Sequence, residues 1–321
     1  MRFLPLLILA IASCTSESDV RVIKLGHGLD PTHPVHRSLV HLQEEVALRS
    51  GGRMRIDVYP SQQLGGEREM LELLQLGSLG MVKVSSAVIE GFDPRFSVLS
   101  VPYLFRDEGH RFRALEGEVG VELLTGLDRY WLRGLGFLDA GSRSFYTKER
   151  PVESPEDLGG LKIRTMESAS QIRMVNELGG SATPISWGEL YSALQQGIVD
   201  GAENNLPSFY SSRHFEVCRF LSLDEHTAIP DVLLISSHVW EDLSTEERAW
   251  LEQAVVSAVE VQKRLWREAS DEALERVVEA GVTVVRPDKT PFRERMETVY
   301  AHYRDTNPEV YVLIQRIQEV P

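Results

Sequence analysis

Short apolar runs with strand-like alternation are separated, in the first part of the chain, by longer stretches with helical spacing. Strands are predicted for residues 20–25, 54–59 and 81–85, where apolar residues alternate with polar ones or form short continuous runs. Helices are predicted for residues 35–49 and 67–77, where apolar residues recur every three or four positions. This order of strand, helix, strand, helix and strand predicts an α/β domain with a parallel sheet.

A similar order of elements returns in residues 158–208. The first strand of this stretch presents Arg164 next to the apolar Ile163. The stretch ends in a polar loop, Asp200–Asn205, which contains Glu203, Asn204 and Asn205. Between them, the spacing predicts a helix, a short strand and a second helix, at residues 170–178, 182–185 and 187–196. We interpret the whole stretch as part of a site for a small carboxylate.

The longest helical pattern runs from Ser244 to Ala280 without a proline or a glycine. Ser244 and Glu247, three positions apart, form a capping box at its start. The pattern predicts one very long helix, or two helices that meet at a kink. Two further strands are expected before this helix, at residues 132–139 and 232–236. After it, the pattern predicts a strand at residues 282–285 and two closing helices at residues 296–303 and 310–317.

Length and charge narrow the class of protein. A chain of 321 residues favours two domains over one modest core. The formal net charge of −14 argues against a nucleic acid as partner, because phosphate binding needs a basic face. A small anionic ligand remains compatible with this charge, since one or two arginines dominate the field at contact range.

The N-terminus has the pattern of an export signal. Residues 3–11 are apolar but too few to span a bilayer as a helix. They lead to Ala12, Ser13 and Cys14, which resemble a bacterial lipobox in which Cys14 carries the lipid. Residues 1–14 are therefore interpreted as a lipoprotein signal peptide; ordinary secretory cleavage near Ser13 is the alternative. The second cysteine, Cys218, lies in an apolar context typical of a buried thiol.

The sequence contains none of the common catalytic or cofactor motifs. It has no GxSxG elbow, no phosphate-binding P-loop, no GxGxxG after a strand and no HExxH. The spacings of His33, His36 and His41 do not place all three on one helical face, and Pro34 interrupts them. We therefore predict neither an enzyme, nor a cofactor, nor a metal site.

Two arginines remain as candidates for binding. Arg164 follows an apolar strand residue, and Arg143 follows a strand and a turn. A guanidinium can hold a carboxylate by two parallel hydrogen bonds, which fixes orientation as well as charge. With Asn204 nearby, the two arginines could support micromolar binding, at about −8 kcal/mol. The alternative is that both arginines pair with carboxylates of the protein itself.

Several long segments together resemble the substrate-binding subunit of tripartite ATP-independent periplasmic (TRAP) transporters, the DctP family. They are LGGLKIRTMES, ISWGELYSALQQGIVDGAENN, QLGGEREMLELLQLGSLGM, FDPRFSVLSVPYLFRDE and VWEDLSTEERAWLEQA. The resemblance implies an α/β periplasmic binding protein fold with two domains, parallel or mixed sheets flanked by helices, and a long helix across both. It places domain I at 20–140 and 230–265, domain II at 141–229 and 266–300, and helices packing on the body at 301–321.

The resemblance also assigns site residues. It implies that Arg164 clamps the carboxylate of the ligand and that Arg143, Asn204 and Glu67 match three further site positions. Glu67 could instead stabilise its own helix N-terminus. His27 and Asp231 are placed near the site by analogy, although a loop histidine bonded to the backbone is an equal alternative for His27.

Other residues suit a polyhydroxy ligand. Glu203 and Asn205 could accept hydroxyl hydrogens together with Glu67 and Asn204. Trp187 could stack on a sugar face, although a tryptophan at a helix start is more often part of a core. The segments ENNLPSF, SRHFEV and LDEHTAIPDVLLIS are similar to the uronate branch of the family, which usually has Pro-Glu where this chain has Pro230-Asp231.

The implied function is capture of a sugar acid outside the inner membrane and its delivery to a TRAP permease. The protein would be a periplasmic monomer, lipid-anchored at Cys14, that works by closure of two domains on a hinge and performs no chemistry. A C4-dicarboxylate-binding subunit and a sensor that presents its ligand to a membrane receptor kinase are the alternatives.

Overall fold

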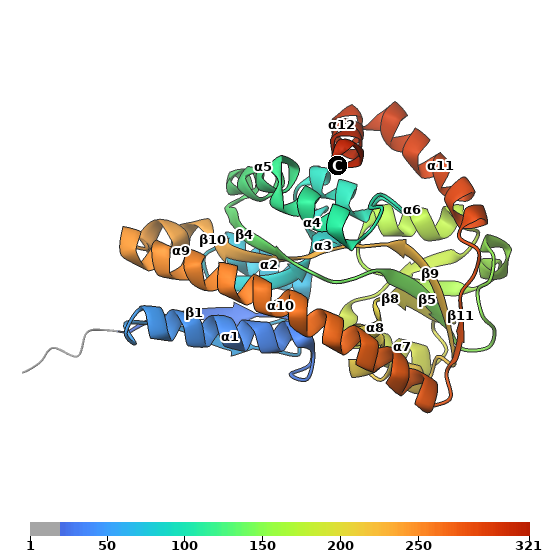
Figure 1. Cartoon of the computed structure of the whole chain (residues 1–321), viewed down its shortest axis with the longest axis horizontal. Coiled ribbons are helices and arrows are strands. Elements are labelled where there is room, and N and C mark those ends of the chain that lie inside the picture. The colour runs from blue at the N-terminus through green and yellow to red at the C-terminus, as the bar shows by residue number, and fades with distance from the viewer. Residues whose placement is uncertain (1–19) are drawn as a thin grey trace, which may run out of the picture.

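The computed structural model describes residues 20–321 and contains two β-sheets flanked by helices (Figure 1). The proposed signal peptide and Cys14 lie outside these residues. The first sheet has the strand order β2-β1-β3-β10-β4 and the second has β11-β9-β5-β8-β6-β7. The first sheet consists of β1 (Arg21–Gly26), β2 (Met54–Tyr59), β3 (Met81–Ser85), β4 (Leu132–Leu138) and β10 (Asp231–Ser236). The second consists of β5 (Arg143–Thr147), β6 (Lys162–Thr165), β7 (Ser181–Pro184), β8 (Gly201–Asn204), β9 (Phe220–Thr227) and β11 (Thr283–Val285).

The first sheet is mixed rather than purely parallel. Strand β1 pairs in parallel with β2 and β3, as the order of elements predicts. Strand β10 then lies between β3 and β4 and is antiparallel to both. All six of its residues are buried, which agrees with the apolar run predicted at 232–236. Strand β10 lies in the middle of the first sheet, although it is distant from β3 and β4 in the sequence, because a largely apolar strand is most stable with a partner on both edges.

The second sheet contains a correction to the sequence-based prediction. Residues 201–204 form strand β8 and not a loop, with β5 on one side and β6 on the other. The polar side chain of Glu203 is tolerated there because it meets Arg143 of the neighbouring β5. The sequence pattern does not reveal strand β9 either. Its polar residues Asp224 and His226 are also tolerated in the interior, because they are buried against each other.

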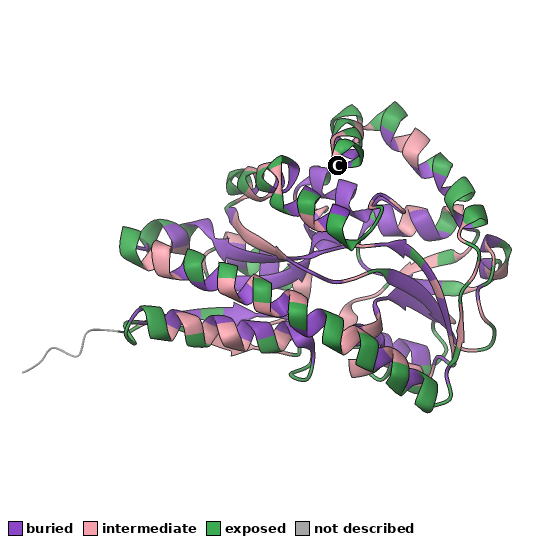
Figure 2. Cartoon of the chain, in the orientation of Figure 1, coloured by how far each residue is buried: buried purple, intermediate pink, exposed green. Residues whose placement is uncertain are grey.

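Helices cover both sheets. Those around the first sheet are α1 (Pro34–Arg49), α2 (Glu67–Gln75), α3 (Ser86–Ile89), α4 (Glu108–Glu116), α5 (Glu118–Gly126) and α9 (Ser237–Asp242), with the 3-10 helix η1 (Pro94–Ser100). Those around the second are α6 (Ala169–Glu177), α7 (Leu190–Gln195) and α8 (Leu206–Ser211), with the 3-10 turn η4 (Trp187–Glu189). Figure 2 shows that the strands are largely buried and that the helices expose one face.

One helix joins the two halves. Helix α10 (Thr245–Glu279) is a single helix of 35 residues, so the kinked alternative is not observed. Ser244 caps it as predicted: its hydroxyl accepts from the amide of Glu247, whose carboxylate accepts from the amide of Ser244 at 2.8 Å. The helix packs on α1 and β4 of the first half and on α8 of the second (Figure 1). Among residues 20–321, no helix is both long enough and apolar enough to cross a membrane.

The chain also passes between the sheets in two short crossings, after β4 and after β9. The predicted domain limits at 140/141 and 229/230 fall at these crossings, whereas those at 265/266 and 300/301 fall inside single helices, residues 245–279 and 290–306. The division into domains remains a prediction. After β11, helix α11 (Thr290–Thr306) packs on α6 and helix α12 (Pro308–Glu319) packs on η1 and α5. Four apolar residues of α12 are buried in the largest core cluster: Val310, Leu313, Ile314 and Ile317.

Candidate functional site

A cavity of about 460 Å³ lies between the two sheets. Its size suits a small organic ligand. Seven of the residues singled out in the sequence line it, from both halves of the molecule: Glu67, Arg143, Arg164, Trp187, Asn204, Asn205 and Asp231. The structure therefore brings together residues that are far apart in the chain.

Arg164 is a buried cation that has no carboxylate partner among residues 20–321. It lies on β6 with 2% of its surface exposed, and its Nε donates to the carbonyl oxygen of Ile185 at 2.8 Å. Its Nη1 has no hydrogen-bond partner, and within residues 20–321 no carboxylate lies at ion-pair distance. Burial lowers the pKa of Arg164, although a guanidinium stays charged. A buried cation with an unpaired donor favours an anion as its partner.

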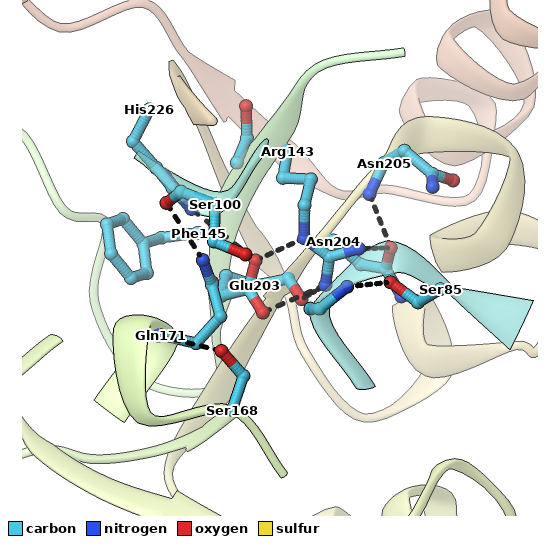
Figure 3. Close-up of polar contacts among 12 residues, drawn as sticks. Ser85, Ser100, Arg143, Phe145, Ser168, Gln171, Glu203, Asn204, Asn205 and His226 are labelled. Carbon is cyan, nitrogen blue, oxygen red and sulfur yellow. Dashed lines mark hydrogen bonds and ion pairs between the residues drawn. The ribbon is translucent and has the colours of Figure 1, made fainter. Parts of the chain in front are cut away.

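Arg143, in contrast, is satisfied by the protein. Its Nε and Nη2 bond the two carboxylate oxygens of Glu203 at 2.5 and 2.8 Å, and Nη1 donates to Oδ1 of Asn204 at 2.8 Å (Figure 3). The alternative of internal pairing therefore holds for Arg143 and not for Arg164. Arg143 borders the cavity and orients Asn204, whose Oδ1 also accepts from the amide of Asn205 at 2.8 Å. Asn204 itself lines the cavity, and both of these bonds use its Oδ1.

Glu203 belongs to a buried charge network behind the cavity wall. His226 lies with Nε2 3.4 Å from Glu203 and with Nδ1 2.8 Å from Asp224. Burial would raise the pKa of Glu203, but Arg143 and His226 hold it at about 2. Burial would lower the pKa of His226, but Asp224 and Glu203 raise it to about 9. Both groups are charged at neutral pH, and Glu203 does not line the cavity.

The opposite wall carries three charges in contact. Lys83 on β3 lies 2.9 Å from Oδ2 of Asp231 and 3.6 Å from Oε1 of Glu67. Its side chain is 3% exposed, whereas those of Glu67 and Asp231 are 17% and 10% exposed. Burial would lower the pKa of Lys83, but Asp231 and Glu67 raise it, so the amine stays charged. These residues form a wall with two carboxylates and one ammonium, hereafter the Glu67–Lys83–Asp231 wall.

His27 is not brought to the cavity. Its Nδ1 accepts from the amide of Leu29 at 3.1 Å and its Nε2 lies 3.0 Å from Nδ1 of His36, so the backbone-bonded alternative describes it. Burial, with Lys83 nearby, lowers the pKa of His27 to about 3. The other histidines considered for a metal lie in separate contacts: His33 with Ser208, and His41 with Ser257.

Trp187 and Asn205 combine structural and lining roles. Trp187 packs against one apolar cluster from each half, and the centre of its ring lies 5.9 Å from the guanidinium carbon of Arg164. Asn205 caps α8, because its Oδ1 accepts from the amide of Ser208 at 2.9 Å. Trp187 and Asn205 therefore line the cavity and also stabilise the local structure around it.

Sequence reasoning missed Lys83 and several uncharged lining residues, among them Gln62, Ser85 and Ser208. Lys83 occupies the middle of a short apolar strand, MVKVS, where a lysine looks like the solvent-facing member of an alternation. Its burial could have been suspected only by pairing it with Glu67 and Asp231. Those partners are not its neighbours in the sequence.

Two further contacts connect the two halves, one outside the cavity and one between residues that line it. Glu90, at the end of α3, accepts from the hydroxyl of Ser168 at 2.7 Å and from the amide of Ser170 at 3.0 Å, both at the start of α6. The ring of His33 lies 3.2 Å from the hydroxyl of Ser208 on α8. The sheets are therefore held together on more than one side of the cavity, and Glu90 is not among its lining residues.

Two α/β halves that enclose a cavity with one open guanidinium define a solute-binding protein. The comparison with protein families agrees: residues 25–306 match the profile of the DctP family, bacterial extracellular solute-binding protein family 7. The chain belongs to this family of TRAP solute-binding proteins.

Known relatives extend over nearly the whole chain. A solute-binding protein of Chromohalobacter salexigens is 33% identical over 90% of this chain and 86% of its own length. A TRAP periplasmic solute-binding protein of Anaerococcus prevotii, solved with bound D-glucuronate, is 36% identical and has a TM-score of 0.91, covering 94% of this chain and 98% of its own. A protein of Bradyrhizobium, solved with D-galacturonate, is 36% identical with a TM-score of 0.90, covering 93% of this chain and 100% of its own.

Proposed function

We propose that this protein captures a sugar acid of the uronate type and delivers it to a TRAP permease. The observation that carries the proposal is the open guanidinium of Arg164, which faces the same cavity as the carboxylates of Glu67 and Asp231. The guanidinium would take the carboxylate of the ligand, and the carboxylates would accept hydrogens from its hydroxyls. The structures of relatives with D-glucuronate and D-galacturonate support this assignment.

The proposed mechanism is closure of the two halves on the ligand, without any chemical change of it. A ligand that contacts both walls stabilises the closed arrangement by its differential affinity for it. The short crossings after β4 and β9 would serve as the hinge, with α10 as the long brace. The protein would act as a monomer.

A panel of acids tests the proposed ligand class. In isothermal titration at neutral pH, D-glucuronate or D-galacturonate is expected to bind with micromolar or lower Kd, at least tenfold more tightly than succinate. The reason is that a hydroxyl-bearing ligand can use both walls, whereas succinate has no hydroxyl to donate. A panel in which succinate binds best would replace the uronate with a C4-dicarboxylate.

The proposed lipid anchor at Cys14 has a separate test. Cys14→Ser removes the only thiol of the lipobox-like segment, so the protein is expected to move from the membrane fraction to the soluble extracytoplasmic fraction. Fractionation followed by immunoblotting measures this. Cys218→Ser is the matched control, since that thiol is buried. Membrane association that survives Cys14→Ser would reject the anchor.

A further inference from the structure

The cavity contains more carboxylates than cations. The carboxylates that line it are Glu67, Glu69, Glu167, Glu189 and Asp231, and the cations are Arg68, Lys83, Arg143 and Arg164. Three of these cations already have protein partners. Arg68 lies 3.3 Å from Glu72, Lys83 contacts Asp231 and Glu67, and Arg143 holds Glu203. Within the described residues, the cavity therefore offers Arg164 as its one uncompensated positive charge.

The Glu67–Lys83–Asp231 wall has the opposite balance. Its two carboxylates share one ammonium, and burial raises the pKa of Glu67 in spite of Lys83, with Asp231 adding to the rise. A further negative charge beside this wall would therefore be repelled in a partly desolvated place. A hydroxyl group suits this wall, because both carboxylates retain lone pairs that can accept its hydrogen. A second carboxylate on the ligand would face these two carboxylates, and Lys83, which also lines the cavity, is already shared between them.

We propose that the Glu67–Lys83–Asp231 wall is a charge filter. It restricts the site to sugar acids with a single carboxylate and rejects those with a second carboxylate at the far end, such as aldarates. This inference rests on the proposed function, since it takes Arg164 as the position of the first carboxylate. It assigns to Lys83 the role of holding Glu67 and Asp231 in place rather than of binding the ligand carboxylate.

Three acids with the same carbon skeleton separate charge from shape. D-glucuronate is a cyclic acid with one carboxylate, D-gluconate is open-chain with one, and D-glucarate is open-chain with two. In isothermal titration of the full-length mature protein at neutral pH, D-glucarate is expected to bind at least about 100-fold more weakly than D-gluconate. D-gluconate and D-glucarate differ in a single group, CH2OH against carboxylate, so that ratio reports the second charge.

Charge removal on the wall should relax the filter. In Glu67→Gln combined with Asp231→Asn, the D-gluconate to D-glucarate affinity ratio is expected to fall at least tenfold, with an absolute gain for D-glucarate. Asp231→Asn alone, which leaves Lys83 with Glu67, should give a smaller change in the same direction. Glu260→Gln is the control: it removes the same charge from an exposed residue outside the cavity that pairs with Lys263, and should keep the ratio within about twofold.

The outcomes separate the two proposals. Binding of D-glucarate to the unaltered protein within tenfold of D-gluconate would overturn the filter while leaving the sugar-acid function intact. Equal weakness of both open-chain acids beside tight D-glucuronate would show that ring shape selects the ligand, and would also overturn it. Failure of all three acids and of D-galacturonate to bind would instead reject the proposed function. Because the first comparison uses the unaltered protein, misfolding of a variant does not prevent the decision.

Discussion

Arg164→Ala is expected to weaken the binding of D-glucuronate by at least about 100-fold while the protein remains folded. Arg164 is buried, its Nη1 has no partner, and no carboxylate within residues 20–321 pairs with it. Each charge-assisted hydrogen bond contributes roughly 1.5–3 kcal/mol, so the loss of two bonds corresponds to roughly 3–6 kcal/mol. Isothermal titration gives the change in Kd, and circular dichroism verifies the fold.

Two variants sharpen this experiment. Arg164→Lys keeps the positive charge but loses the planar fork, and we expect an intermediate loss of affinity. Arg267→Ala removes an arginine that pairs with Glu108 on the surface, and should leave Kd unchanged. Near-normal binding by Arg164→Ala would show that the carboxylate binds elsewhere in the cavity.

Arg143→Met is expected to lower the free energy of unfolding by about 3–5 kcal/mol. The substitution leaves the carboxylate of Glu203 buried without its main partner and releases Asn204 from its bond to Nη1. Chemical denaturation monitored by circular dichroism measures the loss. Arg276→Met, which removes an exposed partner of Glu279, is the matched control and should change stability by less than about 1 kcal/mol.

The pKa values of Glu203 and His226 determine the pH at which the stability of the Arg143→Met variant should be measured. Glu203 has its pKa lowered from 4.5 to about 2, so its stabilising contribution is complete above pH 4.5 and is lost as the pH falls toward 2. His226 has its pKa raised from 6.5 to about 9, so its contribution is complete below pH 6.5 and is lost as the pH rises toward 9. Both contributions are complete near pH 6, where the variants should be compared.

A second substitution identifies the cause of the loss. Glu203→Gln in the Arg143→Met background removes the unpaired charge but keeps a side chain that can hydrogen-bond to His226. The double variant is expected to regain at least about half of the lost stability, as coupled residues do in a double-mutant cycle. A double variant as unstable as the sum of the single ones would contradict a direct charge interaction between the two side chains.

Local patterns in the sequence predicted those elements whose apolar spacing is uninterrupted. The early strands and helices, and the capped α10, lie close to where the spacing placed them. Strand β8 and strand β9 were missed because charged residues occupy buried positions in both. Such positions are stabilised by partners on other strands, such as Arg143 for Glu203, and pairing between distant strands leaves no local periodicity.

The candidate site likewise contains residues that the sequence predicts and residues that only the folded structure reveals. The motifs located Arg164 and Asn204 in the cavity wall, but they could not tell which arginine has an internal partner. That depended on β5 and β8 being neighbours, which sets Glu203 beside Arg143. Lys83 was overlooked because its two partners come from α2 and β10, which meet β3 only in the folded molecule. A sequence pattern cannot predict the burial of a side chain whose partners come from two other elements of the fold.

Glu90 gives the affinity a component that no ligand contact supplies. Its carboxylate bonds the start of α6 but lies outside the cavity, so in the proposed closing motion these bonds exist only when the halves are together. They set the fraction of molecules that are already competent to bind, and the apparent Kd scales inversely with that fraction. A change at Glu90 would then shift the affinities for all ligands by one common factor and leave their ratios intact, so capture strength and selectivity can vary independently in this fold.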